Sequence, residues 1–325
     1  MKTLNYGTVY NKNATLYYLE NSKFKVAISD FGASIQEYTV KTKNGAIDIV
    51  LGFDTALLCV ESGTYAGAII GRVANGIENA TFTLGGKKYD LFINEPYNIC
   101  NHGGERGFDK YFYEVKNFSE AEITLTRTSQ DGEENFPHSL QIEVTYTLTD
   151  NGLSIKIKGL AGGETYFAPT SHPYFNLSGF KNSVESVLLK VNAQKYTVKG
   201  ESGLPNGKIE PIKNTPYNFG EFKELGTYDF DVNFCAESEH KATAIDKNSN
   251  LQLDVYSNLK GLQLYTPNFV KTVYGKQNLK YNGRCAFCLE PQFYPNAVNI
   301  SEFTKPLIKK GEQKEYYINY FVTEV

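Results

Sequence analysis

No stretch of this 325-residue sequence approaches the length of apolar residues that a membrane-spanning helix needs. The N-terminal segment has no apolar run after Lys2, so we expect no secretion signal. Basic residues are not in excess, because the net charge is -3, and nothing favours nucleic acid or an anionic membrane as a partner. The five cysteines are odd in number and scattered, unlike a disulfide framework. These absences together predict a cytoplasmic protein that binds neither nucleic acid nor membrane.

Metal and nucleotide motifs are missing as well. Cys285 and Cys288 have the spacing of a metal or redox pair, but no second such pair and no nearby histidine accompanies them. On a strand, residues three apart point to opposite faces, so the two thiolates cannot share one ion. The glycine-rich run 103–107 lacks the Gly-Lys-Ser/Thr of a phosphate-binding loop. We therefore predict no metal site and no nucleotide site.

Tryptophan is also absent, and the aromatic residues are 24 tyrosines and 21 phenylalanines, which favour strands. No long segment has a helical period, whereas short alternating segments recur from end to end. Clear strands are expected at 24–28, 139–148, 153–157, 187–191, 251–255, 262–265 and 316–322, and a tight hairpin at Gly85-Gly86 between 81–84 and 87–91. Many strands with frequent turns predict an all-β fold, a large antiparallel β-sandwich formed as one domain by residues 1–325.

Two of the four histidines stand in segments that favour a functional role. His102 precedes two glycines that would let the backbone approach a ligand, although a simple turn histidine is the alternative. If 169–177 is extended, His172, Tyr174 and Asn176 share one face and apolar residues share the other. The first face would suit a polyhydroxylated ligand. A core histidine with a hydrogen-bond partner is the alternative interpretation.

One carboxylate stands out in the same way. Phe287 and Leu289 alternate with small residues and with Glu290, so the small side chains leave space beside the carboxylate, as a cleft floor would. Pro291 is expected to end the regular strand, because proline cannot donate to the ladder. An edge-strand carboxylate that faces solvent is the alternative.

Six runs of the sequence occur in an order that one enzyme family shares. They are Gly71-Arg72-Val73-Ala74-Asn75, Asn101-His102-Gly103-Gly104 with Gly107-Phe108-Asp109-Lys110, His172-X-Tyr174-Phe175-Asn176-Leu177, Asp231-X-Asn233-Phe234, Gln263-Leu264-Tyr265-Thr266-X-Asn268-Phe269 and Leu289-Glu290-X-Gln292. Together they span nearly the whole chain and resemble the aldose 1-epimerases, the galactose mutarotases. The resemblance implies a large β-sandwich with an open sugar cleft, no cofactor, and interconversion of the anomers of free hexoses such as galactose or glucose. We expect a monomer or a weak homodimer.

The resemblance also implies roles for individual residues. His172 matches the general acid of the family and Glu290 its general base. The positions that hold the sugar match Asn75, His102, Tyr174, Asp231 and Gln263. Asp229 is a nearby rival for the role of Asp231.

Three departures from the family pattern bear on sugar binding. Gly76 stands where an arginine commonly grips the sugar, Val232 where the family has histidine, and Asn296 where it has aspartate. The loss of the arginine leaves open a non-catalytic sugar-binding relative. A hexose 6-phosphate mutarotase is a further alternative, for which only Arg106 and Lys110 offer a basic cluster. Retention of both proton-transfer residues favours the enzyme.

Overall fold

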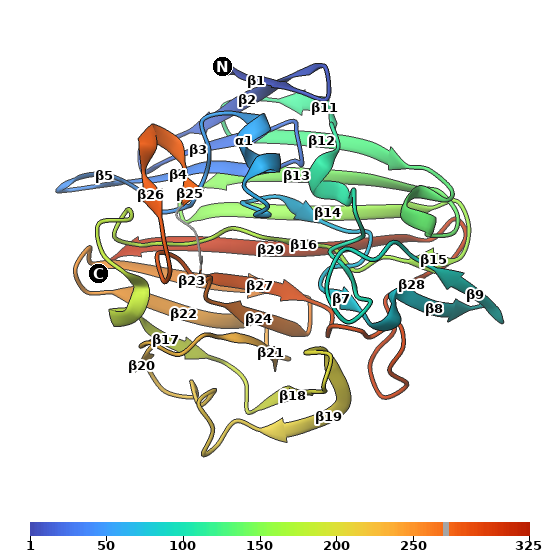
Figure 1. The fold of residues 1–325 in the computed structure, drawn as a ribbon. Coiled ribbons are helices and arrows are strands. Elements are labelled where there is room, and N and C mark those ends of the chain that lie inside the picture. The colour runs from blue at the N-terminus through green and yellow to red at the C-terminus, as the bar shows by residue number, and fades with distance from the viewer. Residues whose placement is uncertain (269–272) are drawn as a thin grey trace.

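The computed structural model describes residues 1–268 and 273–325. Phe269, the last residue of one of the six runs, lies outside the described residues. Nearly every long element is a strand, and the three large sheets are paired in the antiparallel sense (Figure 1). The chain therefore has the all-β antiparallel architecture that the sequence predicts.

The largest sheet has nine strands. Its central hairpin follows directly from the sequence, because alternate residues of β13 (Leu140–Thr149) are buried and β14 (Gly152–Ala161) pairs with it residue by residue. The other strands, in order across the sheet, are β11 (Glu114–Phe118) and β12 (Glu122–Ser129) before this hairpin, and β29 (Gln313–Glu324), β23 (Leu251–Ser257), β22 (His240–Asp246), β17 (Leu188–Val191) and β20 (Lys223–Glu224) after it.

Two five-stranded sheets complete the framework. One runs in sequence order through β1 (Lys2–Val9), β2 (Lys12–Glu20), β3 (Phe24–Ser29), β4 (Ile35–Thr42) and β5 (Gly45–Asp48). The other has the order β19 (Pro205–Pro211), β18 (Lys195–Lys199), β21 (Asp231–Cys235), β24 (Gly261–Tyr265) and β27 (Cys288–Gln292). Val26 of β3, Ile155 of β14 and Leu264 of β24 belong to one continuous hydrophobic core, so all three sheets bury a face in it.

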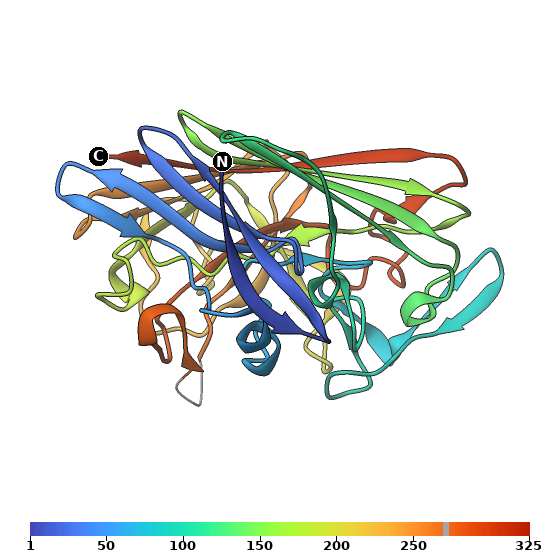
Figure 2. The ribbon, with the colours of Figure 1, turned by 90° about the horizontal axis from the view of Figure 1, so that it is seen from above.

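The remaining elements are short. They are α1 (Ala56–Glu61), the strands β6 (Ile69–Ile70), β7 (Gly76–Ile77), β8 (Thr81–Leu84), β9 (Lys87–Asp90), β10 (Cys100–Asn101), β15 (Thr165–Tyr166), β16 (Thr170–Ser171), β25 (Val273–Tyr274), β26 (Lys280–Tyr281) and β28 (Leu307–Ile308), and the 3-10 turns η1 (Glu78–Ala80), η2 (Phe108–Lys110), η3 (Glu133–Asn135), η4 (Val184–Ser186) and η5 (Lys276–Asn278). The predicted hairpin between β8 and β9 is confirmed, with φ of 59° at Gly85 and 78° at Gly86. Seen from above, the long strands lie along one side of the molecule and α1 with many loops along the other (Figure 2). None of the helices in the described part of the chain is long and apolar enough to cross a membrane.

Candidate active site

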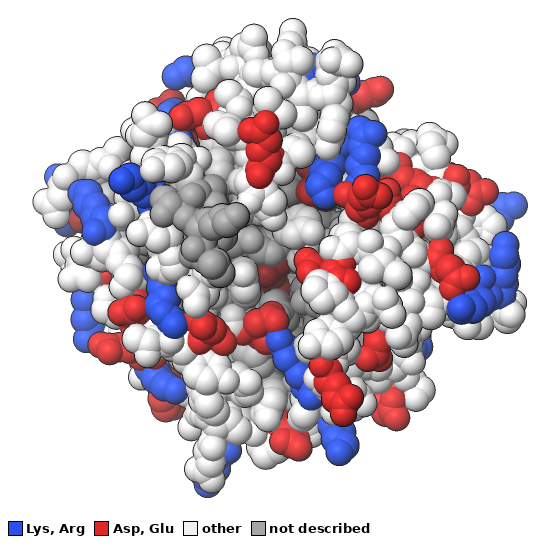
Figure 3. Space-filling view, viewed as in Figure 1, with Lys and Arg blue, Asp and Glu red and all other residues white. Residues whose placement is uncertain are grey.

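A cavity of about 610 Å³ lies between β24, β27 and the loops that flank α1, β7 and β10. The face of the molecule drawn in Figure 3 is hollowed near its centre, with carboxylate side chains in and around the hollow. All seven predicted site residues line this cavity: Asn75, His102, His172, Tyr174, Asp231, Gln263 and Glu290. Residues far apart in the sequence are thus brought to one place by the sheets.

His172 is held by its backbone just after β16, which pairs with β6. Its N–H donates to Ala68 O at 3.0 Å, and its carbonyl accepts from Gly67 N–H at 2.9 Å. The side chain is 4% exposed. Because both backbone groups are hydrogen-bonded, the backbone position from which the imidazole extends is fixed at the wall of the cavity.

Regular strand pairing in the segment 169–177 is confined to Thr170 and Ser171, and beyond them Phe175 makes isolated antiparallel bridges with Val50 and Phe287. His172 and Tyr174 still share the cavity, and their rings stack with centroids 4.9 Å apart. Asn176 does not join them, because its side-chain amide donates to the carbonyls of Asn182 and Cys285 at 2.8 and 2.7 Å. Asn176 therefore fixes the loop rather than facing the cavity.

Glu290 lies in β27, the edge strand of its sheet, opposite Gln263 of β24. Phe287 and Leu289 point into the main hydrophobic core, as the alternation predicts, while the Glu290 side chain is 2% exposed and lines the cavity. The strand continues through Pro291, so the prediction that proline ends it is wrong. An edge strand tolerates proline because one side of its backbone needs no ladder donor.

A side-chain hydrogen bond joins the histidine segment to the glutamate strand, in addition to the two backbone hydrogen bonds between Phe175 and Phe287. The buried hydroxyl of Thr170 donates to the carbonyl of Pro291 at 2.6 Å. Thr170 lies two residues before His172, and Pro291 directly follows Glu290. The bond therefore fixes the spacing between the two backbones that carry the candidate acid and base.

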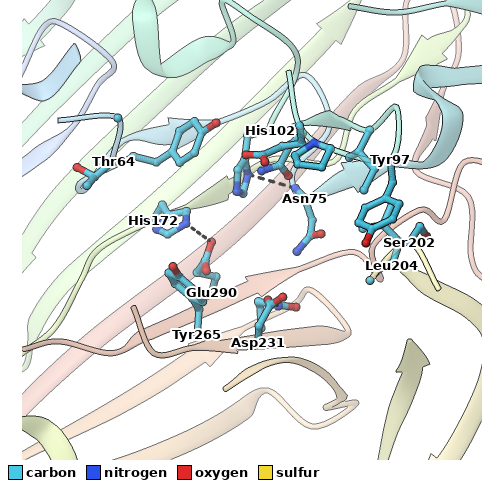
Figure 4. A pocket seen from close by; sticks show the side chains of 18 of the residues that line it. Thr64, Asn75, Tyr97, His102, His172, Ser202, Leu204, Asp231, Tyr265 and Glu290 are labelled. Carbon is cyan, nitrogen blue, oxygen red and sulfur yellow. Dashed lines mark hydrogen bonds and ion pairs between the residues drawn. The ribbon is translucent and has the colours of Figure 1, made fainter. Parts of the chain in front are cut away.

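The imidazole and the carboxylate meet at the cavity wall. His172 Nε2 lies 3.5 Å from Glu290 Oε2 (Figure 4). Within the described residues, Glu290 Oε2 and His172 Nδ1 have no hydrogen-bond partner. The two groups are close enough to act on adjacent oxygens of one small molecule.

Burial sets the protonation of this pair. It raises the pKa of Glu290 well above its usual range, with the nearby carboxylate of Asp231 adding to the effect, and it lowers the pKa of His172 to about 4. The pair therefore holds one proton between these limits. Because the pKa of Glu290 is raised and that of His172 is lowered, the proton lies mainly on the carboxylate, and its transfer to the imidazole leaves the net charge of the pair at zero.

His102 is oriented by the backbone of Asn75. Its Nδ1 accepts from the Asn75 N–H at 3.2 Å, and its own N–H donates to Asn75 O at 3.1 Å. An accepting Nδ1 places the proton of a neutral imidazole on Nε2. Burial, aided by His172 and Lys110, lowers the pKa of His102 well below its usual range, so the ring stays neutral. His102 is thus a fixed hydrogen-bond donor at its Nε2.

The two glycines after His102 serve the fold instead of a ligand. A Cβ on Gly103 would lie 2.0 Å from Gly71 O, and a Cβ on Gly104 would lie 2.3 Å from a carboxylate oxygen of Glu134. Glycine is therefore needed at both positions, because a side chain there would collide with neighbouring segments of the same chain.

Asp231 and Gln263 form a polar unit on neighbouring strands. Gln263 Nε2 donates to Asp231 Oδ1 at 2.6 Å, and the Lys199 ammonium pairs with the same carboxylate. The rival Asp229 instead bonds Arg284 at 2.8 Å and does not line the cavity. Of the two aspartates, only Asp231 faces the cavity.

Leu204 packs against Gly76 at the far end of the cavity. A Cβ on Gly76 would lie 2.5 Å from Leu204 Cδ2 and 3.0 Å from Ile99 Cγ2. Leu204 lines the cavity beside Ser202 and Tyr97 (Figure 4). The sequence alone does not indicate this contact, because Leu204 lies in a loop without any periodic signal.

Tyr65 and Tyr265 are further cavity residues that the sequence analysis did not assign. The Tyr65 ring lies 4.4 Å from the His102 ring and 5.8 Å from the His172 ring, between centroids. Tyr265 lies in one of the six motif runs, two residues after Gln263, and this position could have identified it as a cavity residue. Tyr65 lies in a loop that offers no such signal.

Comparisons with known proteins agree with this geometry. The sequence profile of the aldose 1-epimerase family matches residues 15–320. Galactose mutarotase from Sus scrofa is 36% identical over 311 residues, 91% of this chain and 90% of the relative. The human galactose mutarotase is 34% identical over 314 residues, 92% of this chain and 91% of the relative. The crystal structure of an aldose epimerase homologue from C. elegans has a TM-score of 0.90 at 24% identity and covers 95% of this chain and 99% of that one. This chain belongs to the aldose 1-epimerase family.

Proposed function

We propose that the protein interconverts the α and β anomers of free hexoses such as galactose and glucose by acid/base-catalysed ring opening and reclosure. The buried pair of His172 and Glu290, 3.5 Å apart at the wall of an open cavity, carries this proposal. Membership of the aldose 1-epimerase family supports it.

In the proposed reaction the single proton of the pair moves through the sugar. Glu290 takes the proton of the C1 hydroxyl while protonated His172 gives its proton to the ring oxygen, and the bond between C1 and the ring oxygen breaks. The open aldehyde turns about its C1–C2 bond. The new hydroxyl then attacks the other face of C1, returns its proton to His172, and Glu290 reprotonates the C1 oxygen. Atoms and charge balance, and the pair ends as it began.

The other cavity residues position the sugar in this proposal. His102 donates from Nε2 towards the ring oxygen side, because its Nδ1 already accepts from Asn75. Asp231, Gln263 and Asn75 offer hydrogen bonds to hydroxyl groups, and the Tyr174 ring, stacked on His172, gives an apolar surface for the sugar ring. We propose further that residues 1–325 act as one domain in the cytoplasm, as a monomer or weak homodimer, with neither cofactor, nucleic acid nor membrane as partner.

A hexose 6-phosphate is a less suitable substrate. Within the described residues, the cavity lining contains no lysine or arginine. Arg106 instead stacks on Tyr10 and Tyr111, and the Lys110 ammonium is bonded to Glu105 O at 2.8 Å. A phosphate there would have no counter-charge from the lining residues.

A non-catalytic sugar-binding relative remains the second candidate, and Gly76 is the observation in its favour. A binding site gains nothing from a buried acid and base that lie 3.5 Å apart. The pair therefore favours the enzyme over the binding protein.

The test is polarimetry of freshly dissolved α-D-galactose and α-D-glucose with the wild type, Glu290→Gln and Glu114→Gln. Glu114 is exposed on β11, an edge strand of the nine-stranded sheet, and does not line the cavity, so its variant is the matched control for loss of one carboxylate. We expect Glu290→Gln to lower kcat by about 10²–10⁴-fold and Glu114→Gln to leave it unchanged. Unaccelerated relaxation by the folded wild type on both sugars would sink the enzyme proposal.

A further inference from the structure

A thiol lies directly beside the acid/base pair and has no part in the proposed reaction. Cys288 precedes Glu290 by two positions in β27, so both side chains point to the same face of the strand. One imidazole nitrogen of His172, the sulfur of Cys288 and a carboxylate oxygen of Glu290 all lie within 4.8 Å of one another. The sequence analysis considered Cys288 only with Cys285 and so missed this grouping.

We propose that His172, Cys288 and Glu290 form a binding site for one thiophilic divalent cation, of the Zn²⁺ or Cd²⁺ type. Binding of this ion prevents proton transfer by His172 and Glu290. Imidazole, thiolate and carboxylate are the ligands that zinc takes in proteins. Mg²⁺ and Ca²⁺ prefer oxygen ligands in larger number, so this set selects against them. No ion is present in the structure.

The geometry needs little change to close around an ion. In a tetrahedral zinc site, bond lengths of ~2.0–2.3 Å place neighbouring ligand atoms roughly 3.3–3.8 Å apart. His172 Nε2 and Glu290 Oε2 already lie 3.5 Å apart. The sulfur of the fully buried Cys288 lies within 4.8 Å of both ligand atoms, so it has to approach them to complete three ligands.

Unused bonding capacity points to the same place. Glu290 Oε2 lacks a hydrogen-bond partner within the described residues, although the residue is only 2% exposed. Buried polar groups in proteins are nearly always bonded, so unbonded groups here indicate a site that something else completes. A cation satisfies the carboxylate oxygen directly.

Charge and access also fit. A thiolate and a carboxylate carry two negative charges, which neutralise a divalent cation in this buried position. Binding exchanges the S–H bond for a bond from sulfur to metal, and the thiol proton and the proton of the pair leave to solvent. His172 and Glu290 line the cavity, so the ion enters there and water takes the fourth position.

This inference rests on the proposed function only for its effect on catalysis, so binding is measured separately. Cd²⁺ is titrated into the metal-free wild type, Cys288→Ser and Cys285→Ser, with the ultraviolet charge-transfer band of the cadmium–thiolate bond as the readout. We expect one equivalent to saturate the band in the wild type and in Cys285→Ser, and Zn²⁺ to reverse it by competition. Cys288→Ser should lose the band and bind at least about tenfold more weakly.

Mutarotation is followed in the same samples, relative to the metal-free rate of each variant. The rate of the wild type should fall in step with the band and return on addition of a chelator. Cadmium NMR of the wild type separates a site with one sulfur ligand from a site with none, so the test does not depend on how Cys288→Ser folds.

A wild type without the stoichiometric band, or a band unchanged in folded Cys288→Ser, overturns the cation site even if the protein is an active mutarotase. Full activity at saturating Cd²⁺ overturns the claim that the ion disables the pair. A band that depends on Cys288 in a protein that never accelerates mutarotation supports the cation site and removes the proposed function instead.

Discussion

At the reacting end of the cavity, His172 and Glu290 are 4% and 2% exposed, and both stand next to paired strand backbone. At the far end, Leu204 and Ser202 come from the loop between β18 and β19. The departure at Gly76 falls at this far end, whereas the acid and base are kept. The proposed acid and base therefore depend on strand geometry, whereas the proposed sugar contacts come from strands at Asp231 and Gln263 and from loops at the far end.

The pH dependence of kcat/KM gives the largest expected effect and reports on the protonation of His172 and Glu290. Below about pH 4 the pair takes up a second proton and loses its base, because burial lowers the pKa of His172 to that value. Above the raised pKa of Glu290 the pair loses its only proton and with it the acid. We expect a plateau between these limits, with roughly tenfold loss per pH unit outside it, and an alkaline limb that Glu290→Gln removes. An acidic limb near the ordinary histidine pKa would contradict the shared proton.

Thr170→Val tests the reacting end of the cavity, because it removes the hydrogen bond between the segment that carries His172 and the strand that carries Glu290. Loss of the 2.6 Å bond to Pro291 O should lower kcat about tenfold with little change in KM, and lower the free energy of unfolding by about 1–3 kcal/mol. Thr170→Ser keeps the hydroxyl and should restore kcat. Steady-state kinetics and thermal unfolding of both variants measure this.

Ser202→Ala is the matched change at the far end, where the Ser202 hydroxyl donates to Glu78 at 2.7 Å. Here KM should rise a few-fold and kcat should hold, because the loop orients the sugar without touching the reacting atoms. Equal effects of Thr170→Val and Ser202→Ala on kcat would break the distinction between the two ends.

Gly76→Arg tests whether the missing arginine can simply be restored. Because a Cβ there would lie 2.5 Å from Leu204 Cδ2, the single variant should lose about 1–3 kcal/mol of stability and gain no affinity for galactose. Gly76→Arg with Leu204→Ala should recover stability and lower KM. A lower KM for the single variant would show that Leu204 yields its place readily.

Local pattern explains what the sequence predicted well. The β13–β14 hairpin and the alternation around Glu290 depend on a period of two residues, which is visible in the sequence itself. The pairing after Ser171 is irregular, because His172 bonds to Ala68 and Gly67 whereas Phe175 pairs with Val50 and Phe287. The prediction that Pro291 ends the strand was wrong because the edge position of β27, which tolerates proline, depends on the whole sheet.

The same limit applies to the site. The seven predicted residues line one cavity. They could be predicted because the motif runs that carry them resemble a known family. Tyr65 and Leu204 were missed, because a loop residue shows its neighbours only once the chain is folded. The Cys288 grouping was missed for a similar reason: its partner histidine is distant in sequence.

The central claim, that His172 and Glu290 work as one unit sharing one proton, is tested most directly by anomer exchange of galactose measured by NMR. The wild type is compared with His172→Asn, Glu290→Gln and the double variant. The account predicts that each single variant loses about 10²–10⁴-fold in rate and that the double variant is no more than a few-fold slower than either. Losses that multiply in the double variant would contradict it, because the two residues would then act independently.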